Sequence, residues 1–338
     1  MKSRFNKVYV LAPANHATGG VELAHQLVDV INNYDGEAYI VYEKGNKIIP
    51  NLPVTSAYSS YNIKVANEIE DSDNNILILP EIYFDYIYRF NNINFGLWWM
   101  SVDNHYHAAN WIDLYHSPGG IIDKLKFIKS YLRKKSRNKI ADLKKIESRT
   151  VHFYQSAYAQ NHLYNLGFSK IMPLKDYINT EFLTLDKEKN IIREDIVLYN
   201  PAKGWHFTKK ILAANPDITF VPLKNLSREQ LRDLMCKAKL YIDFGNFPGK
   251  DRLPREAALN NLCIITGKRG ASRFYEDIPI DDEYKFTNRV SDISSISNKI
   301  KDVLSDYQYH MRRFNFFREQ ILKEQEEFNQ QIYTFFFE

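Results

Sequence analysis

The sequence predicts an α/β protein of two Rossmann-like, doubly wound domains, and three observations carry this prediction. The chain has 338 residues, about twice the size of a common domain. Short apolar runs alternate with amphipathic segments in each half, which is typical of a parallel sheet whose strands are joined by helices. The composition, with 44% hydrophobic and 25% charged residues, is that of an ordinary globular protein.

The first half begins with the order strand, turn, helix and strand. The apolar run Val8–Pro13 precedes a turn that contains Gly19 and Gly20, and residues 21–31 then carry apolar side chains at helical spacing. The run is too short for the core of a signal peptide, so we interpret it as a buried strand and expect a cytoplasmic protein. Further strands are expected at 38–42, 76–80, 95–100 and 152–155, and a helix at 156–166.

A second alternating pattern begins near Ile196. It predicts strands at 196–200, 218–223, 240–244 and 262–266, and helices at 207–213, 227–238 and 253–259. Ser227 and Gln230 have the spacing of a capping box at the start of one of these helices. Because the polar stretch 176–190 separates the two patterns, we expect an N-terminal domain at 1–180 and a second domain at 181–310. The charged and aromatic segment 291–333 predicts a long C-terminal helix with breaks.

Composition and charge exclude several classes of protein. No stretch approaches the roughly 18 uninterrupted apolar residues that span a bilayer. The two cysteines, Cys236 and Cys263, are far apart and lack metal-ligand spacing, so neither a zinc site nor a disulfide framework is predicted. The net charge of +4 is too small to indicate nucleic acid by itself.

The most informative segment is 241–259, in which a buried strand leads through a Gly/Pro loop into a helix. In open α/β sheets, ligands bind at the carboxyl ends of strands, where helix N-termini favour anions. Near Gly249, the cations Lys250, Arg252 and Arg255 add to this preference, so the segment suits a diphosphate. Glu256 can accept hydrogen bonds from a ribose diol. The alternative interpretation is a solvated, charged start of a helix.

Here the sequence resembles the retaining GT-B glycosyltransferases, particularly the family 4 group. The matching stretches are the loop 244–248, the run 255–258 with its Glu-Ala pair, and the turn and strand 261–266. The resemblance implies that Glu256 contacts the donor ribose. The family often has a second Glu eight positions earlier, where this chain has Pro248. The contacts to the donor sugar must therefore differ from the usual ones.

Three other segments support the resemblance. Lys203 and Gly204 follow the first strand of the second half, where the family places a basic residue and a glycine against the donor phosphates. The turn with Gly19 and Gly20 resembles the family's glycine loop, which faces the reacting sugar, although a plain tight turn also explains it. Arg269 follows the last strand and offers a further cation. The family's GT-B fold places two domains about a central cleft.

The C-terminal end of the chain is too apolar to lie free in solvent. The GT-B resemblance implies that residues 311–338 form a helix that crosses back to the N-terminal domain. Dimerisation and membrane contact are the alternatives for its phenylalanines.

The segment 98–107 is dense in titratable groups and follows an expected strand. Retaining GT-B enzymes often carry a histidine in this loop that touches the transferred sugar, so the resemblance implies this role for His105 or His107. Asp103 is an alternative candidate, as the general base of an inverting mechanism. A structural Asp/His loop is the other interpretation. A zinc site from His105, His107 and His116 is not expected, because their spacing suits no standard site.

The stretch from Lys124 to Arg149 is strongly basic, with eleven Lys or Arg residues against two acids. It is either a solvated helix face or a patch for an anionic membrane surface or a lipid-linked acceptor. Nucleic acid is not expected as a partner, because no RNA-binding pattern accompanies the neighbouring aromatic residues.

Together these features predict a glycosyltransferase of bacterial-type surface polysaccharide synthesis. It would move a sugar from a nucleoside-diphosphate sugar to a glycan or lipid-linked acceptor, with retention and without a metal or another cofactor. Peripheral contact with the inner face of the membrane is expected through the basic stretch. The alternatives are a nucleotide-sugar epimerase of the same architecture and a non-catalytic nucleotide- or glycan-binding protein.

Overall fold

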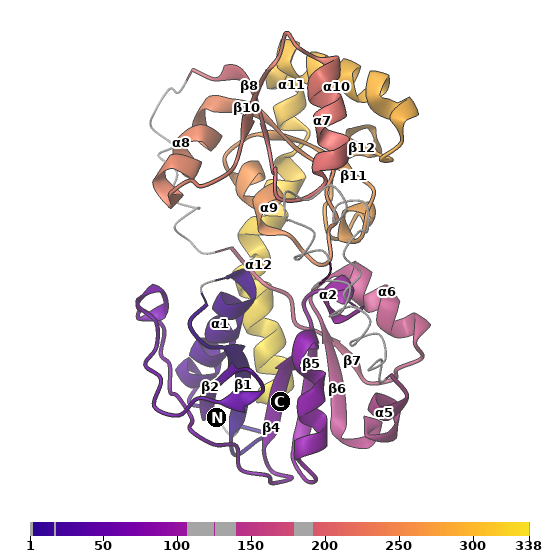
Figure 1. The fold of residues 1–338 in the computed structure, drawn as a ribbon. Helices are drawn as coiled ribbons and strands as arrows, with labels where there is room; N and C mark the ends of the chain where they lie inside the picture. Colours follow the sequence, from indigo (N-terminus) through magenta and orange to yellow (C-terminus); the bar gives the residue numbers. More distant parts are fainter. Residues whose placement is uncertain (1–2, 17, 107–124, 126–139, 179–191, 338) are drawn as a thin grey trace. The chain divides into compact units, whose positions relative to one another are not determined.

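The computed structural model divides the chain into two compact units (Figure 1). The described residues are 3–16, 18–106, 125, 140–178 and 192–337. The first unit contains the described residues of Met1–His105, Asn138–Tyr177 and Glu324–Glu338, and the second those of Tyr106–Arg137 and Ile178–Lys323.

The first unit is built on a seven-stranded sheet in the order β3-β2-β1-β4-β5-β6-β7. All neighbouring strands are parallel except β2 and β3, which form an antiparallel edge. The strands are β1 Val8–Pro13, β2 Ala38–Lys44, β3 Lys47–Ile48, β4 Ile76–Pro80, β5 Asn94–Trp99, β6 Thr150–Tyr154 and β7 Ile171–Pro173. The chain leaves β1 first for β2 and later for β4 on its other side, so the switch point of the sheet lies between β1 and β4.

Helices connect and cover these strands. Among the described residues they include α1 Gly19–Asn33, the 3-10 segment η2 Glu81–Arg89, α2 Val102–Tyr106, α5 Ile140–Lys145 and α6 Ala157–Asn165. α1 packs on β1 and β2, and α6 packs on β6. Every residue of β4 is buried, as expected of an apolar run in a parallel sheet that is covered on both faces.

The end of the C-terminal helix belongs to the core of the first unit. α12 extends over Asn315–Phe336, and its side chains Phe328, Ile332 and Phe336 are completely buried with those of β1, β2 and α1. Phe328 lies 5.3 Å from Tyr177 between ring centroids. The last part of the helix, from Glu324 onward, thus belongs to the first unit and adds its apolar side chains to the core of that unit.

The second unit contains a five-stranded, wholly parallel sheet in the order β12-β11-β10-β8-β9. The strands are β8 Glu194–Tyr199, β9 Thr219–Pro222, β10 Ala238–Asp243, β11 Cys263–Gly267 and β12 Lys285–Phe286. β8 is followed by β9 on one side and by β10 on the other. The switch point of this sheet therefore lies between β8 and β10.

The α-helices among the described residues of the second unit are α7 Trp205–Ala214, α8 Arg228–Lys237, α9 Arg252–Leu259, α10 Ile293–Ser305, α11 Tyr307–Arg312 and the first part of α12. The capping box at Ser227 and Gln230 is present at the start of α8. The segment expected as one broken helix is three helices, since Asp306 leaves the helical conformation after α10 and its side chain caps α11. None of the helices among the described residues is long and apolar enough to cross a membrane.

Candidate active site

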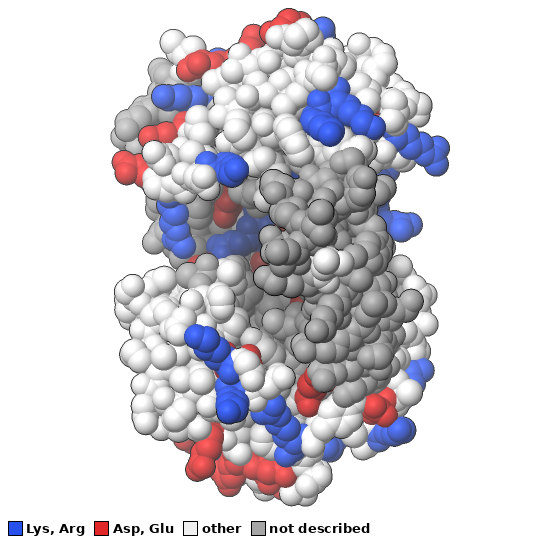
Figure 2. Space-filling view, in the orientation of Figure 1, with Lys and Arg blue, Asp and Glu red and all other residues white. Residues whose placement is uncertain are grey.

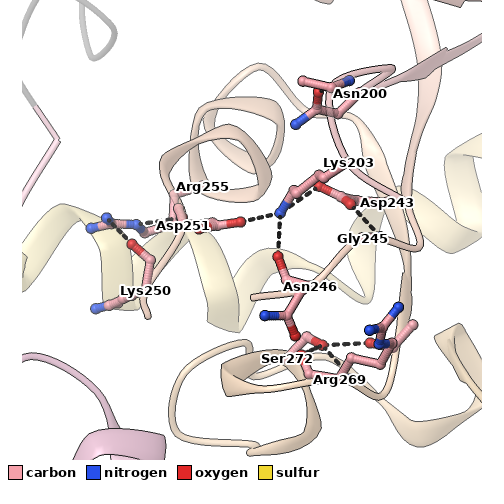
Figure 3. Close-up of polar contacts among 12 residues, drawn as sticks. Asn200, Lys203, Asp243, Gly245, Asn246, Lys250, Asp251, Arg255, Arg269 and Ser272 are labelled. Carbon is pink, nitrogen blue, oxygen red and sulfur yellow. Dashed lines mark hydrogen bonds and ion pairs between the residues drawn. The ribbon is translucent and has the colours of Figure 1, made fainter. Parts of the chain in front are cut away.

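The loops at the switch point of the second sheet bring Lys203 against two carboxylates (Figure 3). Lys203 follows β8, Asp243 ends β10, and Asp251 is the N-cap residue of α9. Nζ of Lys203 lies 3.1 Å from Oδ2 of the completely buried Asp243 and pairs with the Asp251 carboxylate. It also donates to the main-chain oxygen of Asn246 at 3.2 Å. The two loops are therefore joined by one ammonium group.

Two glycines allow the loops to approach this closely. Gly204 has a φ of +67°, and a Cβ there would lie 2.5 Å from the nitrogen of Gly245. A Cβ on Gly245 would overlap the aliphatic stem of Lys203. The resemblance to a known family pointed to Gly204, but only the structure reveals the need for glycine at 245, because it arises from a contact with the other loop.

Burial and charge oppose each other at Lys203. Burial lowers the pKa of the Lys203 ammonium, but Asp243 and Asp251 outweigh it and raise that pKa above its usual range. Burial raises the pKa of Asp251, and Lys203 opposes this rise. Asp243 also accepts hydrogen bonds from the Tyr241 hydroxyl at 2.8 Å and the Gly245 N–H at 2.9 Å. The ion pairs are thus embedded in a hydrogen-bonded network rather than exposed at the surface.

The start of α9 carries two more of the cations that the sequence singled out. Arg255 is buried, and its guanidinium donates to the main-chain oxygens of Lys250 and Asp251, both at 3.2 Å. Nε of Arg252 lies 3.7 Å from a carboxylate oxygen of Glu256, one turn further along α9. Arg255 therefore shapes the loop, whereas Arg252, which is about one-quarter exposed, pairs with the buried Glu256 at the start of the helix.

The loop after β11 packs beside the loop that contains Gly249. Ala271 N–H donates to the Phe247 main-chain oxygen at 2.8 Å, and Gly270, with a φ of +62°, has no room for a side chain against the same residue. Arg269 immediately precedes Gly270, and its N–H donates to Ser272 Oγ at 3.1 Å. Arg269 thus lies at the same carboxyl edge of the sheet as the cations of α9.

The first unit also brings a cluster of residues, Gly19, Gly20 and Glu81, to its switch point between β1 and β4. Gly19 and Gly20 begin α1 after β1, and Glu81 directly follows β4. A Cβ on Gly20 would lie 3.5 Å from the sulfur of Met100, which is an ordinary contact. Packing within the described residues therefore does not require glycine at position 20.

Glu81 is buried in this cluster and was not singled out from the sequence. Its carboxylate accepts the Met100 N–H at 3.1 Å, at the point where β5 ends. Burial raises the pKa of Glu81 to about 7, although main-chain N–H groups, including those of Met100 and Ser101, oppose the rise. Its position directly after an apolar strand is the sequence signal that could have identified it.

The turn that Glu81 supports carries Asp103 and His105 on α2. Nδ1 of His105 lies 3.2 Å from the main-chain oxygen of Glu81, and because a carbonyl only accepts, this nitrogen carries the proton. The imidazole also packs on Trp99 at 4.9 Å between ring centroids. Asp103 accepts a hydrogen bond from the Tyr158 hydroxyl at 2.8 Å, a partner that only the fold reveals. His107 lies outside the described residues.

Two further features considered from the sequence are metal ligation and the basic stretch. Within the part of the chain that the structure describes, no three His, Cys, Asp or Glu residues are arranged to hold a metal ion. Most of the stretch from Lys124 to Arg149 lies outside the described residues. Arg149, at its end, donates to the main-chain oxygens of Ile93 and Phe90, at 2.5 and 3.0 Å, so this cation supports the fold. On the face shown in Figure 2, described basic side chains are spread over both units.

No protein-family model matches the chain, and no curated protein matches its sequence. Solved structures do match. Sucrose-phosphate synthase from Thermosynechococcus elongatus has a TM-score of 0.64 at 12% identity, over 97% of this chain and 98% of that chain. HepE from Anabaena, solved with UDP, has a TM-score of 0.60 at 12% identity, over 97% and 98% of the two chains. TarM has a TM-score of 0.54 at 15% identity and is matched over 56% of its length, so this chain spans just over half of it.

These likenesses identify the fold. Because two of them cover nearly the full length of both chains, the chain has the GT-B fold, with two Rossmann-like domains. The fold class expected from the sequence is thereby confirmed. At these low identities, substrate and reaction must be argued from the residues of this chain.

Proposed function

We propose that the protein is a glycosyltransferase that moves a sugar from a nucleoside-diphosphate sugar to a glycan or lipid-linked acceptor. The observation that carries this proposal is that three cations, Lys250, Arg252 and Arg269, lie with Glu256 at the switch point of the second sheet, on a GT-B fold. Ligands of open α/β sheets bind at such switch points, and a helix N-terminus flanked by cations suits a diphosphate.

On the donor side, Lys250 and Arg252 would face the diphosphate and Glu256 would bind the ribose hydroxyls. Arg269 lies at the same edge and would add a further cation. These charges would stabilise the leaving diphosphate as a divalent cation does in other transferases, so the reaction is proposed to be metal-independent. UDP is the first nucleotide to test, because HepE was solved with UDP and with UDP-glucose.

The first unit would supply the groups that meet the reacting sugar. His105 carries its proton on Nδ1, so in the neutral ring Nε2 is the nitrogen that can accept a hydrogen bond from a sugar hydroxyl. We propose a retaining reaction. Asp103 would instead be the general base if the product had the opposite anomeric configuration, and NMR of the product distinguishes the two.

The cellular setting is the synthesis of a surface polysaccharide in the cytoplasm, at the inner face of the membrane. One of the matching structures supports this setting: WaaG, with a TM-score of 0.51 at 10% identity, is a glycosyltransferase involved in lipopolysaccharide biosynthesis. The basic stretch from Lys124 to Arg149 would contact anionic lipid. Co-sedimentation with vesicles that contain anionic phospholipid tests this contact, and binding should fall as salt is raised.

Calorimetric titration with UDP, GDP, dTDP and CMP tests the function directly. We expect one of these nucleotides to bind, and the corresponding sugar nucleotide to release free nucleotide slowly, with EDTA having no effect. Glu256→Ala should weaken binding about tenfold or more through loss of charged hydrogen bonds. Glu229→Ala, an exposed glutamate on α8, is the matched control. Isomerisation of the sugar would instead indicate an epimerase, and binding without turnover, even with glycan acceptors, would indicate a binding protein. Absence of nucleotide binding would overturn the proposal.

A further inference from the structure

Lys203 stands at the site that a family member would use for the donor phosphates, yet its N–H donors are engaged within the protein. An ammonium group has three N–H donors. In Lys203 they face Asp243, Asp251 and the main-chain oxygen of Asn246 (Figure 3). The Phe247 ring lies against the same group, with Nζ 3.7 Å from its centroid. A phosphate oxygen could bond to Lys203 only by replacing one of these partners.

Replacing either carboxylate would leave that carboxylate without its cation. Asp243 is completely buried, and the Asp251 side chain is about one-quarter exposed, at 26%. Separating such a pair is strongly unfavourable, because the charge left behind is poorly solvated. The contact between Lys203 and a diphosphate is therefore disfavoured by the two residues that hold Lys203.

The pairing of Asp251 with Lys203 also affects the N-terminus of α9. An aspartate at the N-cap of a helix commonly accepts hydrogen bonds from the N–H groups of the first turn. Asp251 is the N-cap residue of α9, but its side chain makes no capping hydrogen bond and is paired with Lys203 instead. Lys203 thus draws a carboxylate away from the helix terminus at which we place the donor diphosphate.

We propose that Lys203 is a positioning residue of the donor site, which acts by holding and neutralising Asp243 and Asp251. With both carboxylates held, the diphosphate rather than Asp251 occupies the N-terminus of α9, and Lys250 and Arg252 make the phosphate contacts. This inference rests on the proposed donor site. It predicts one result that a direct contact between Lys203 and the phosphate does not predict. Lys203 becomes dispensable for nucleotide binding once the two carboxylates are removed.

The test compares Lys203→Met with the charge-neutral variant K203M/D243N/D251A, in the full chain. An asparagine at position 243 keeps an acceptor for the Gly245 N–H, and an alanine at position 251 can neither repel the ligand nor cap α9. Lys209→Met, at an exposed lysine of α7, is the matched control. Affinities for UDP and for uridine are measured by calorimetry, and folding is checked by circular dichroism and thermal unfolding.

We expect Lys203→Met to weaken UDP binding about tenfold or more while uridine changes less than about threefold, because the carboxylates, no longer neutralised, repel only the charged ligand. The charge-neutral variant should bind UDP within about threefold of the wild type. If the charge-neutral variant loses UDP affinity as Lys203→Met does, Lys203 contacts the phosphate and the inference is wrong. Equal losses for UDP and uridine would show a general collapse of the loop and would also overturn it.

The charge-neutral variant decides the question even if Lys203→Met fails to fold, because it leaves no unpaired buried charge. The wild-type titration separates this inference from the proposed function. If the wild type binds none of the four nucleotides, the proposed function fails. If it binds and only the pattern of variants disagrees, the function stands and the positioning role fails.

Discussion

Replacing Glu81 with glutamine should change the pH dependence of stability in the first unit. Burial raises the pKa of Glu81 from its ordinary value of 4.5 to about 7. The folded state therefore favours the protonated carboxyl, so its contribution to stability is complete below pH 4.5 and is lost as the pH rises through 7. At about 1.4 kcal/mol per pH unit, the loss amounts to about 3 kcal/mol. Glutamine keeps an oxygen for the Met100 N–H but does not ionise.

Urea unfolding at several pH values, followed by tryptophan fluorescence, measures this difference. Trp98 and Trp99 are suitable reporters because they are completely buried on β5, the strand that leads to Met100. The stability of Glu81→Gln relative to the wild type should rise by about 3 kcal/mol between about pH 4.5 and pH 8. Glu68→Gln, at an exposed position, is the matched control. Parallel profiles for the wild type and Glu81→Gln would refute the reasoning.

Two further substitutions test the packing of each unit. Gly245→Ala should destabilise the second unit by about 2 kcal/mol because the new methyl overlaps the stem of Lys203, whereas Gly20→Ala, with an ordinary contact, should have little effect on thermal stability. Phe328→Ala should cost the first unit about 3–5 kcal/mol in urea unfolding, since this completely buried ring completes its core. Phe316→Ala on the same helix is the control, because that ring is 48% exposed. Similar losses for both phenylalanines would contradict the assignment of the end of α12 to the core.

Much of the fold could be predicted because the strands of a parallel sheet are long apolar runs. Val8–Pro13 and Ile76–Pro80 were predicted with the bounds that the structure shows. The short strands at the sheet edges, such as Lys47–Ile48 and Lys285–Phe286, were missed. Two residues are too few to show a period of two, and their pairing depends on a neighbouring strand rather than on their own pattern.

The candidate site was predictable only as a set of residue types. The cations and the glutamate of the loop before α9 and of α9 itself were recognisable, because charged residues where a Gly/Pro loop leads from a strand into a helix indicate an anion site. The partners of these residues were not recognisable. Asp243 lay within the strand expected at 240–244 and Asp251 was one more charge in the loop, while Glu81 and Tyr158 belong to no recognised motif.

The sequence by itself determined that the chain alternates strands and helices in two halves and carries a group of cations where a Gly/Pro loop leads into the helix expected at 253–259. These properties depend on apolar periodicity and on neighbours within a few positions along the chain. Only the tertiary structure decided that Lys203 is held by Asp243 and Asp251, 40 and 48 residues further on. Parallel strands bring the carboxyl ends of distant segments to one edge of a sheet, so the charge balance there is set by residues that sequence spacing does not connect.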